Sequence, residues 1–151
     1  MGRSPEDDPR AVILLDSNVV IDAQNEGSPF FEPARRLILE AVATTGAAVN
    51  AVIVAELCAG KTDVADLVLI ELDAAGVQLF DLPVGAAPIC GRAYRRYRLS
   101  RRKSAGSAAP VTPLPDFFIG AHAELMGWAL ATRDSERFRL YFPEVQLIEP
   151  S

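Results

Sequence analysis

The stretch Ala11-Val-Ile-Leu-Leu-Asp-Ser-Asn18 places five apolar residues directly before an aspartate. Such a continuous apolar run predicts a short strand that is buried on both faces of a sheet. The polar Asp16-Ser-Asn18 ends this strand, and a helical turn over 19–23 is expected to follow. In a parallel α/β sheet, functional side chains gather beyond the carboxyl ends of the strands. Asp16 is therefore the first residue to consider for a site.

Further apolar stretches alternate with helical patterns along the rest of the chain. Strands are expected at 47–50, 77–80, 128–131 and 145–148. Helices are expected at 32–45, 51–59, 62–75, 86–102 and 116–127. This alternation predicts a three-layer α/β fold over 11–151, a single domain with a mainly parallel central sheet of about five strands flanked by helices. A loose, flexible tail is expected over 1–10.

Length and composition exclude several classes of protein. The 151 residues, half of them hydrophobic, suit one domain with a real core and not a disordered chain. No apolar run approaches the ~18–20 residues of a membrane helix, and the polar N-terminus does not resemble a signal peptide. We therefore expect a cytoplasmic protein without membrane contact. Two cysteines, Cys58 and Cys90, are too few for a disulfide framework and are expected as buried free thiols.

Four carboxylates lie near the ends of the predicted elements. Asp16 and Asp134 follow strands, Glu56 lies one turn into the helix after the second strand, and Asp116 begins a helix after a Pro-rich loop. Each has an ordinary structural explanation, such as a helix cap for Asp116 or a turn for Asp16 and Asp134. Glu56 is the hardest to explain in this way, because no basic residue follows it before Lys61. Together, four acids at the ends of α/β elements indicate a shared cleft, since buried charges are normally paired or bound to metal.

The sequences around these acids resemble the motifs of the PIN-domain nucleases. The four stretches are Leu14-Leu-Asp-Ser-Asn-Val-Val20, Ala55-Glu-Leu-Cys-Ala-Gly60, Asp116-Phe-Phe-Ile-Gly-Ala-His-Ala123 and Thr132-Arg-Asp-Ser-Glu-Arg-Phe138. Their order and intervals fit the family from about Val12 to the C-terminus, and 141–148 also resembles the VapC-type toxins of bacterial toxin–antitoxin pairs. The resemblance implies a PIN fold, a divalent-metal-dependent endoribonuclease and a cognate antitoxin.

Carboxylate oxygens are hard ligands suited to Mg²⁺ or Mn²⁺. We expect Asp16 and Asp116 to bind the metal directly or nearly so, and Glu56 and Asp134 to act through water or to position the attacking water. Hydrogen bonds from Asn18 and Thr132 are expected to orient these ligands. Metal-activated water needs no protein nucleophile and no histidine base. This chemistry suits a chain whose single histidine, His122, is expected to be a packing residue.

One basic segment stands out in an acidic chain. The net charge is −5 and the pI about 4.9, which ordinarily argues against a nucleic-acid partner, yet residues 92–103 hold seven of the 15 Lys and Arg residues and no acid. We favour RNA contact over a solvated helix face, because an acidic cleft needs nearby positive charge to hold a polyanion. An antitoxin-docking surface is a third interpretation. The candidate RNA-binding residues are Arg95, Arg96, Arg98, Arg101, Arg102 and Lys103.

The resemblance also implies assembly, either as a homodimer or as a hetero-oligomer with the antitoxin. The apolar residues that offer surface for such a partner are Phe30, Phe31, Leu37, Ile38 and those of 64–72. An alternative function is a non-catalytic PIN module that binds RNA or a protein, although the presence of all four acids argues against it.

Two other α/β classes that place an aspartate after the first strand fit less well. A haloacid-dehalogenase-type phosphatase requires a second aspartate two residues after the first, where this chain has Asn18. A response-regulator receiver requires adjacent acids near the chain start and a lysine after a late strand. Here Asp7-Asp8 precede the first strand, and no lysine follows Lys103.

Overall fold

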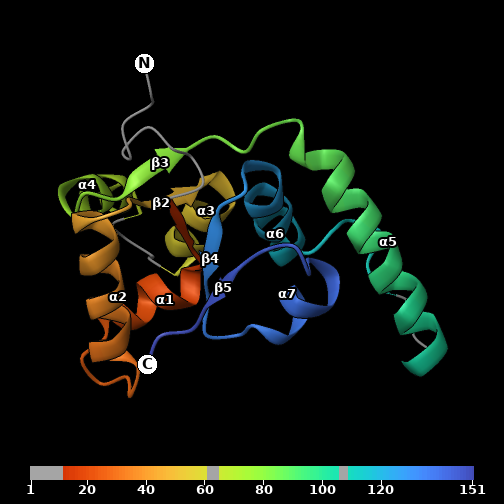
Figure 1. The fold of residues 1–151 in the computed structure, drawn as a ribbon, viewed down its shortest axis with the longest axis horizontal. Coiled ribbons are helices and arrows are strands. Elements are labelled where there is room, and N and C mark those ends of the chain that lie inside the picture. The colour runs from red at the N-terminus through yellow and green to blue at the C-terminus, as the bar shows by residue number, and fades with distance from the viewer. Residues whose placement is uncertain (1–11, 61–64, 106–108) are drawn as a thin grey trace.

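A five-stranded parallel sheet forms the centre of the computed structural model, which describes residues 12–60, 65–105 and 109–151 (Figure 1). The strands are β1 Ile13–Leu15, β2 Ala47–Asn50, β3 Gln78–Phe80, β4 Ala129–Ala131 and β5 Leu147–Ile148. Their order is β3-β2-β1-β4-β5, and every pairing is parallel. The chain moves outward from β1 to β3 and then returns to β4 on the other side of β1. The expected fold class is confirmed, with a sheet that is wholly parallel.

Burial follows the position of each strand in the sheet. All residues of β2 and β4 are buried, as are Leu14 and Leu15 of β1, whereas the edge strands β3 and β5 are half-buried or exposed. Central strands of a parallel sheet are covered by helices on both faces, which is why their sequences are continuous apolar runs. Burying one such side chain contributes about 1.5–3 kcal/mol.

Seven helices of the described residues surround this sheet. They are α1 Ser17–Gln24, α2 Phe31–Ala43, α3 Ala51–Ala59, α4 Leu67–Ala74, α5 Ala86–Ala105, α6 Pro115–Met126 and α7 Glu136–Tyr141. Helices α1, α2 and α4 lie on one side of the strands and α5, α6 and α7 on the other, while α3 packs against both α1 and α6 (Figure 1). The molecule therefore has the three expected layers.

Two polar residues, one directly after β1 and one at the end of β2, cap the next helix. Asp16 accepts a hydrogen bond from the backbone N–H of Ser17 at 2.8 Å, at the start of α1. Asn50 accepts one from the N–H of Ile53 at 3.0 Å, at the start of α3. These bonds satisfy N–H groups that have no partner within the helix. They also fix the angle at which each helix leaves the carboxyl end of the sheet.

Some element boundaries differ from the sequence-based expectation. Helix α4 begins at Leu67 instead of residue 62, and 61–64 lie outside the described residues. Helix α5 continues to Ala105, three residues further than expected. Helix α7 was not predicted, because its six residues are too few to show a helical period. The tail expected over 1–10 lies outside the described residues.

The lone histidine is a packing residue, as expected. His122 is buried, its Nδ1 lies 3.1 Å from Asn50 Nδ2, and its ring packs on Trp128 with centroids 4.9 Å apart. Burial lowers the pKa of His122, which favours the neutral ring. Cys90 is buried, Cys58 is half-buried, and both are free thiols. Among the described residues, no helix has both the length and the apolar character required to cross a membrane.

Candidate active site

The four acids come from four separate elements that meet at the carboxyl end of the sheet. Asp16 lies between β1 and α1, Glu56 on α3, Asp116 in the first turn of α6, and Asp134 between β4 and α7. Asp16 is only 4% exposed, Glu56 and Asp116 are half-buried, and Asp134 is exposed. The site adjoins the point between β1 and β4 where the strand order reverses, which is where open α/β sheets bind ligands.

Asp16 is held in place by hydrogen bonds to both carboxylate oxygens. Thr132 Oγ1 donates to Asp16 Oδ2 at 2.8 Å, and Asn18 Nδ2 lies 3.4 Å from the same oxygen. Burial raises the pKa of Asp16, and the charges of Asp116 and Asp134 raise it further. The bonds from Thr132 and Ser17 oppose this rise. Asn18 and Thr132 therefore both contact the same oxygen of the central carboxylate.

Glu56 reaches the same site from α3. Ser17 Oγ donates a long hydrogen bond of 3.4 Å to Glu56 Oε1. Burial raises the pKa of Glu56, and the charges of Asp16 and Asp116 raise it further. Three carboxylates therefore lie close enough to repel one another. Such repulsion favours either a bound proton or a bound cation at this place.

Asp116 is not the helix cap that a purely structural explanation would require. Leu114 occupies the cap position, and Asp116 is the second residue of α6. Its Oδ2 accepts a hydrogen bond of 3.1 Å from Arg137 of α7, so the two form an ion pair. Burial raises the pKa of Asp116, Arg137 lowers it, and Asp134 raises it. Repulsion by neighbouring acids is thus balanced in part by one guanidinium.

A second ion pair anchors the loop that carries Asp134. Arg133 Nε lies 2.8 Å from Oδ2 of the buried Asp22, and the guanidinium lies 4.7 Å from the centroid of the Phe30 ring. The backbone N–H of Arg133 donates to Asn18 Oδ1 at 3.2 Å. The N–H of Asp134 donates to Thr132 Oγ1 at 3.1 Å. The backbone of this loop is therefore fixed, although the Asp134 side chain is exposed.

Sequence reasoning did not identify Ser17, Asp22, Arg133 or Arg137 as parts of this site. Three of them lie within the quoted motifs, but their partners are distant in the sequence. Arg133 is 111 residues from Asp22, and Ser17 is 39 residues from Glu56. Neither spacing nor composition indicates such contacts. The one available indication was that Arg137 follows Asp134 within the fourth motif.

The donor set suits a hard divalent cation. The three mutually repelling groups are carboxylates, the ligands that Mg²⁺ and Mn²⁺ prefer, and a dication would relieve their repulsion. Within the described part of the chain, however, no three Asp, Glu, His or Cys side chains are already grouped to hold one ion. Asp116 is bound instead to Arg137. The residues therefore fit the ion by their chemistry, without being closed around a common point.

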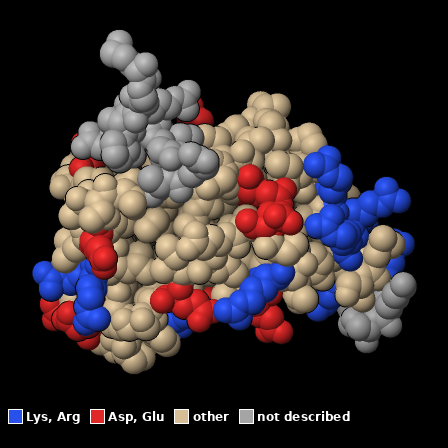
Figure 2. All heavy atoms as spheres, in the orientation of Figure 1, with Lys and Arg blue, Asp and Glu red and all other residues tan. Residues whose placement is uncertain are grey.

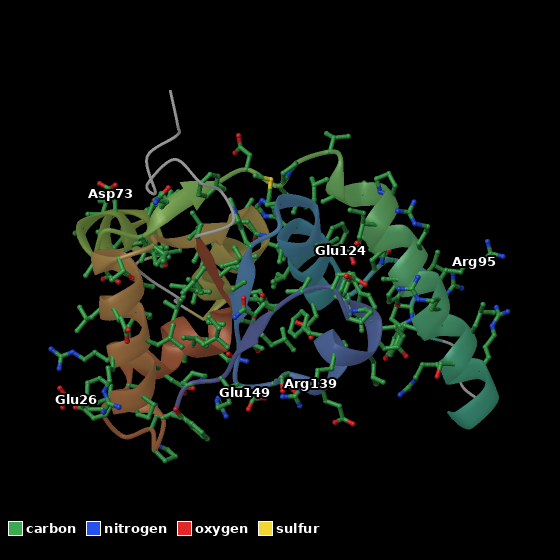
Figure 3. All side chains as sticks on the ribbon, in the orientation of Figure 1. Glu26, Asp73, Arg95, Glu124, Arg139 and Glu149 are labelled. Carbon is green, nitrogen blue, oxygen red and sulfur yellow. The ribbon has the colours of Figure 1, made fainter. Side chains whose placement is uncertain are left out.

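The basic segment forms the outer face of α5. Figure 2 shows Lys and Arg side chains gathered at the end of the molecule that α5 forms, and Figure 3 shows Arg95 pointing away from the body. Within the described residues, no acidic side chain forms an ion pair with Arg95, Arg98, Arg101 or Arg102. Arg96 donates to the backbone oxygen of Tyr141 at 3.1 Å. The side chain of Lys103 lies outside the described residues.

The parallel sheet with acids at its carboxyl end is also described by a protein-family model. The PIN domain model matches residues 13–142, which is most of the chain, and the chain belongs to the PIN domain family. No curated protein matches the chain by sequence. The family assignment confirms the resemblance on which the sequence-based expectations depended.

Solved structures show the same fold. VapBC-1 from nontypeable Haemophilus influenzae is similar with a TM-score of 0.63 and 18% identity, over 91% of this chain and 97% of that chain. VapBC2 from Rickettsia felis bound to a promoter DNA fragment is similar with a TM-score of 0.61 and 18% identity, over 91% of this chain and 98% of that chain. A toxin–antitoxin complex from Klebsiella pneumoniae is similar with a TM-score of 0.58 and 19% identity, over 92% of this chain and 98% of that chain. At such identities the likeness establishes the fold.

Proposed function

We propose that this chain is a divalent-metal-dependent endoribonuclease and the toxin of a type II toxin–antitoxin pair, acting in the cytoplasm. The observation that carries the proposal is the arrangement of Asp16, Glu56 and Asp116 at the carboxyl end of the sheet, where the charge of Asp116 raises the pKa of Asp16, and both charges raise the pKa of Glu56. Carboxylates that repel one another do not stabilise the fold, so a function explains why these acids lie together. The likeness to toxin–antitoxin complexes supports the biological role.

The four acids would have different roles, according to how deeply each is buried. Asp16 is buried and held on both oxygens, so it would fix the position of a Mg²⁺ or Mn²⁺ ion together with Asp116. Glu56 and the exposed Asp134 would hold the attacking water. When bound, the ion would lower the pKa of that water and neutralise charge on the phosphate. Arg137 would compete with the ion for Asp116 and stay beside the substrate once displaced.

Positive charge on α5 supports RNA as the substrate. The outer face of this helix carries Arg95, Arg98, Arg101 and Arg102 without acidic partners among the described residues. Helix α5 packs directly against α6, which carries Asp116. A polyanion bound along α5 would therefore approach the carboxylates from the side. Binding of this kind depends strongly on salt, because each phosphate contact releases counterions.

Exposed apolar residues support assembly with an antitoxin and with a second copy. Helices α2 and α4 expose Leu39 by 56%, Leu69 by 46% and Ile70 by 64%. Large exposed apolar side chains of this kind mark interaction surfaces when they cluster. Of the residues expected there, Phe30, Phe31, Leu37 and Ile38 are half-buried, and Val64 lies outside the described residues. Leu69 and Ile70 belong to the stretch expected to offer surface, and Leu39 extends it on α2.

The decisive experiment is cleavage of a structured RNA by the purified chain, with and without added Mg²⁺ or Mn²⁺. We expect metal-dependent cleavage that is lost in Asp16→Asn and Asp116→Asn, with folded protein by circular dichroism. Water attack leaves a 5′-phosphate, so the new RNA ends should carry one. A 2′,3′-cyclic phosphate would contradict the proposal, because it requires the neighbouring 2′-hydroxyl as nucleophile. Metal-dependent RNA binding without cleavage would favour the non-catalytic module.

A further inference from the structure

An apolar groove lies directly beside the carboxylates. It has a volume of about 500 Å³ and is lined from α3 by Ala51, Ala55 and Ala59, and from the other side by Pro113 and Phe118. Glu56 also lines it and is the one charged residue among the described residues that do so. The groove and the candidate active site therefore share a side chain.

The sequence of α3 explains why this groove is open. Ala51, Ala55 and Ala59 recur every four residues, so they lie on one face of the helix, and all three are exposed. Their methyl groups are too small to fill the space next to Phe118, whose ring is half-buried. A larger side chain at any of these positions would close the groove. The result is a flat apolar surface with an aromatic ring at one wall.

We propose that this groove binds a nucleobase of the RNA strand, next to the phosphate on which the carboxylates act. The proposal rests on the proposed nuclease function and specifies how the same site holds its substrate. Phe118 supplies a stacking face, and the alanines of α3 allow the flat base to enter. Because stacking uses the face of a base, this subsite holds any base but prefers those that stack strongly.

The position of the groove favours a nucleic-acid strand over an apolar peptide. Helix α6 packs against α3 on one side and against α5 on the other. Asp116 lies in the first turn of α6, the helix that also carries Phe118 of the groove and packs against the arginine-bearing α5. A single strand offers phosphates to the arginines and bases to the groove, whereas an apolar peptide would leave the arginines unused. The charge and the apolar surface together match the two chemical parts of one ligand.

A binding experiment without metal tests the subsite separately from catalysis. The probe is a short fluorescent single-stranded RNA in EDTA, compared with a set of the same RNA in which one position at a time lacks its base. For the wild type we expect base removal at one position to weaken binding about tenfold. Phe118→Leu should bind the intact RNA about tenfold more weakly and lose its sensitivity to that position. Phe118→Tyr keeps the ring and should restore both.

Leu125→Ala provides a matched control. Leu125 lies seven residues after Phe118 on the same face of α6, is 41% exposed, and does not line the groove. This variant should bind both kinds of RNA as the wild type does. Thermal unfolding of each variant shows whether Phe118→Leu is folded. Phe118→Tyr supplies an independent result if Phe118→Leu is not.

The first two outcomes of this experiment distinguish the base-binding groove from the proposed nuclease function. Base-dependent binding that needs Phe118, with no cleavage on adding Mg²⁺ or Mn²⁺, would support the groove and contradict the nuclease. Metal-dependent cleavage with binding that is indifferent to Phe118 or to base removal would overturn the groove and leave the nuclease intact. Failure to bind or cleave RNA would overturn both. Weakened binding of a protein partner alone by Phe118→Leu would overturn the nucleobase assignment.

Discussion

Thr132 Oγ1 donates a 2.8 Å hydrogen bond to Asp16 Oδ2, joining residues that are 116 positions apart in the sequence. Thr132 follows β4 and Asp16 follows β1, and these strands are neighbours in the sheet. The same hydroxyl accepts the backbone N–H of Asp134 at 3.1 Å. One buried side chain thus connects the central carboxylate with the loop that carries another. This connection makes Thr132 as important to the geometry as the acids themselves.

Replacing the Thr132 hydroxyl should therefore affect both stability and activity. Thr132→Val leaves the Asp134 N–H and one oxygen of Asp16 without this partner, which we expect to cost about 1–3 kcal/mol in free energy of unfolding. Metal affinity or cleavage rate should fall about 10–100-fold, as for other residues that orient metal ligands. Urea unfolding and metal titration measure these effects. Thr132→Ser keeps the hydroxyl, and an equal loss in that variant would contradict the explanation.

The pKa of Asp16 predicts a pH-dependent difference between the wild type and Asp16→Asn. The folded chain binds the Asp16 proton more tightly than the unfolded chain, since burial raises the pKa from 3.8. Ionisation of Asp16 therefore destabilises the fold, beginning as the pH rises above the unfolded pKa and reaching its full effect above the folded one. Asp16→Asn removes this effect.

Urea unfolding of both proteins in EDTA at several pH values tests this prediction. The stability of Asp16→Asn relative to the wild type should increase as the pH rises from about 4 towards neutrality. A relative stability that does not change with pH, or that falls, would show that Asp16 is not destabilised by ionisation. Added Mg²⁺ should stabilise the wild type more than the variant, because a ligand that binds only the folded state raises its stability.

The ion pair between Arg137 and Asp116 predicts a shift in the pH profile of cleavage. Arg137 lowers the pKa of Asp116, so Arg137→Met should raise it and move the acidic limb of the profile to higher pH. Both side chains are about one-third exposed, so the direct loss of stability should stay below about 1 kcal/mol. Arg139→Met is the matched control, because Arg139 pairs with the exposed Glu149 at the molecular surface (Figure 3). An unshifted profile in Arg137→Met would contradict the role of the pair.

A close approach between α6 and the C-terminal segment predicts a large effect of one methyl group. A Cβ at Gly120 would overlap the ring of Phe142, which is fully buried and cannot move freely. We expect Gly120→Ala to cost about 1–3 kcal/mol or more in thermal unfolding, as overpacking does. Gly91→Ala on the outer side of α5 meets no atom within 4 Å and should stabilise the helix by about 0.5–1 kcal/mol. Equal effects at both positions would contradict the packing.

The arginines of α5 should control the salt dependence of RNA binding. Replacing Arg101 and Arg102 by alanine should lower the slope of log affinity against log salt by about 1.4, since each contact with a single strand contributes about 0.7. The double variant Arg35→Ala/Arg36→Ala removes the same charge from the exposed surface of α2 and serves as the control. If both double variants change the slope equally, net charge and not the α5 surface controls binding.

Much of the fold could be predicted because its main patterns are local. Apolar runs that end on Asp16 and Asn50 specify buried strands followed by capped helices, and all five strands were placed to within two residues at either end. Helix α7 was missed because a six-residue helix shows too little of a helical period. Its Arg137 was therefore not connected with Asp116. The family was recognisable from the order and intervals of four motifs, each of which spans fewer than nine residues.

The sequence by itself determined which groups this protein has, and the tertiary structure decided which of them meet. Acids after parallel strands imply a shared cleft, because parallel strands carry their carboxyl ends to one edge. Only the folded chain shows that Thr132 orients Asp16, that Arg137 pairs with Asp116, and that the alanines of α3 leave a groove beside Glu56. These contacts depend on helix angles and side-chain packing between distant segments. No local pattern encodes such relationships, because the interactions that set them are made between residues far apart in the chain.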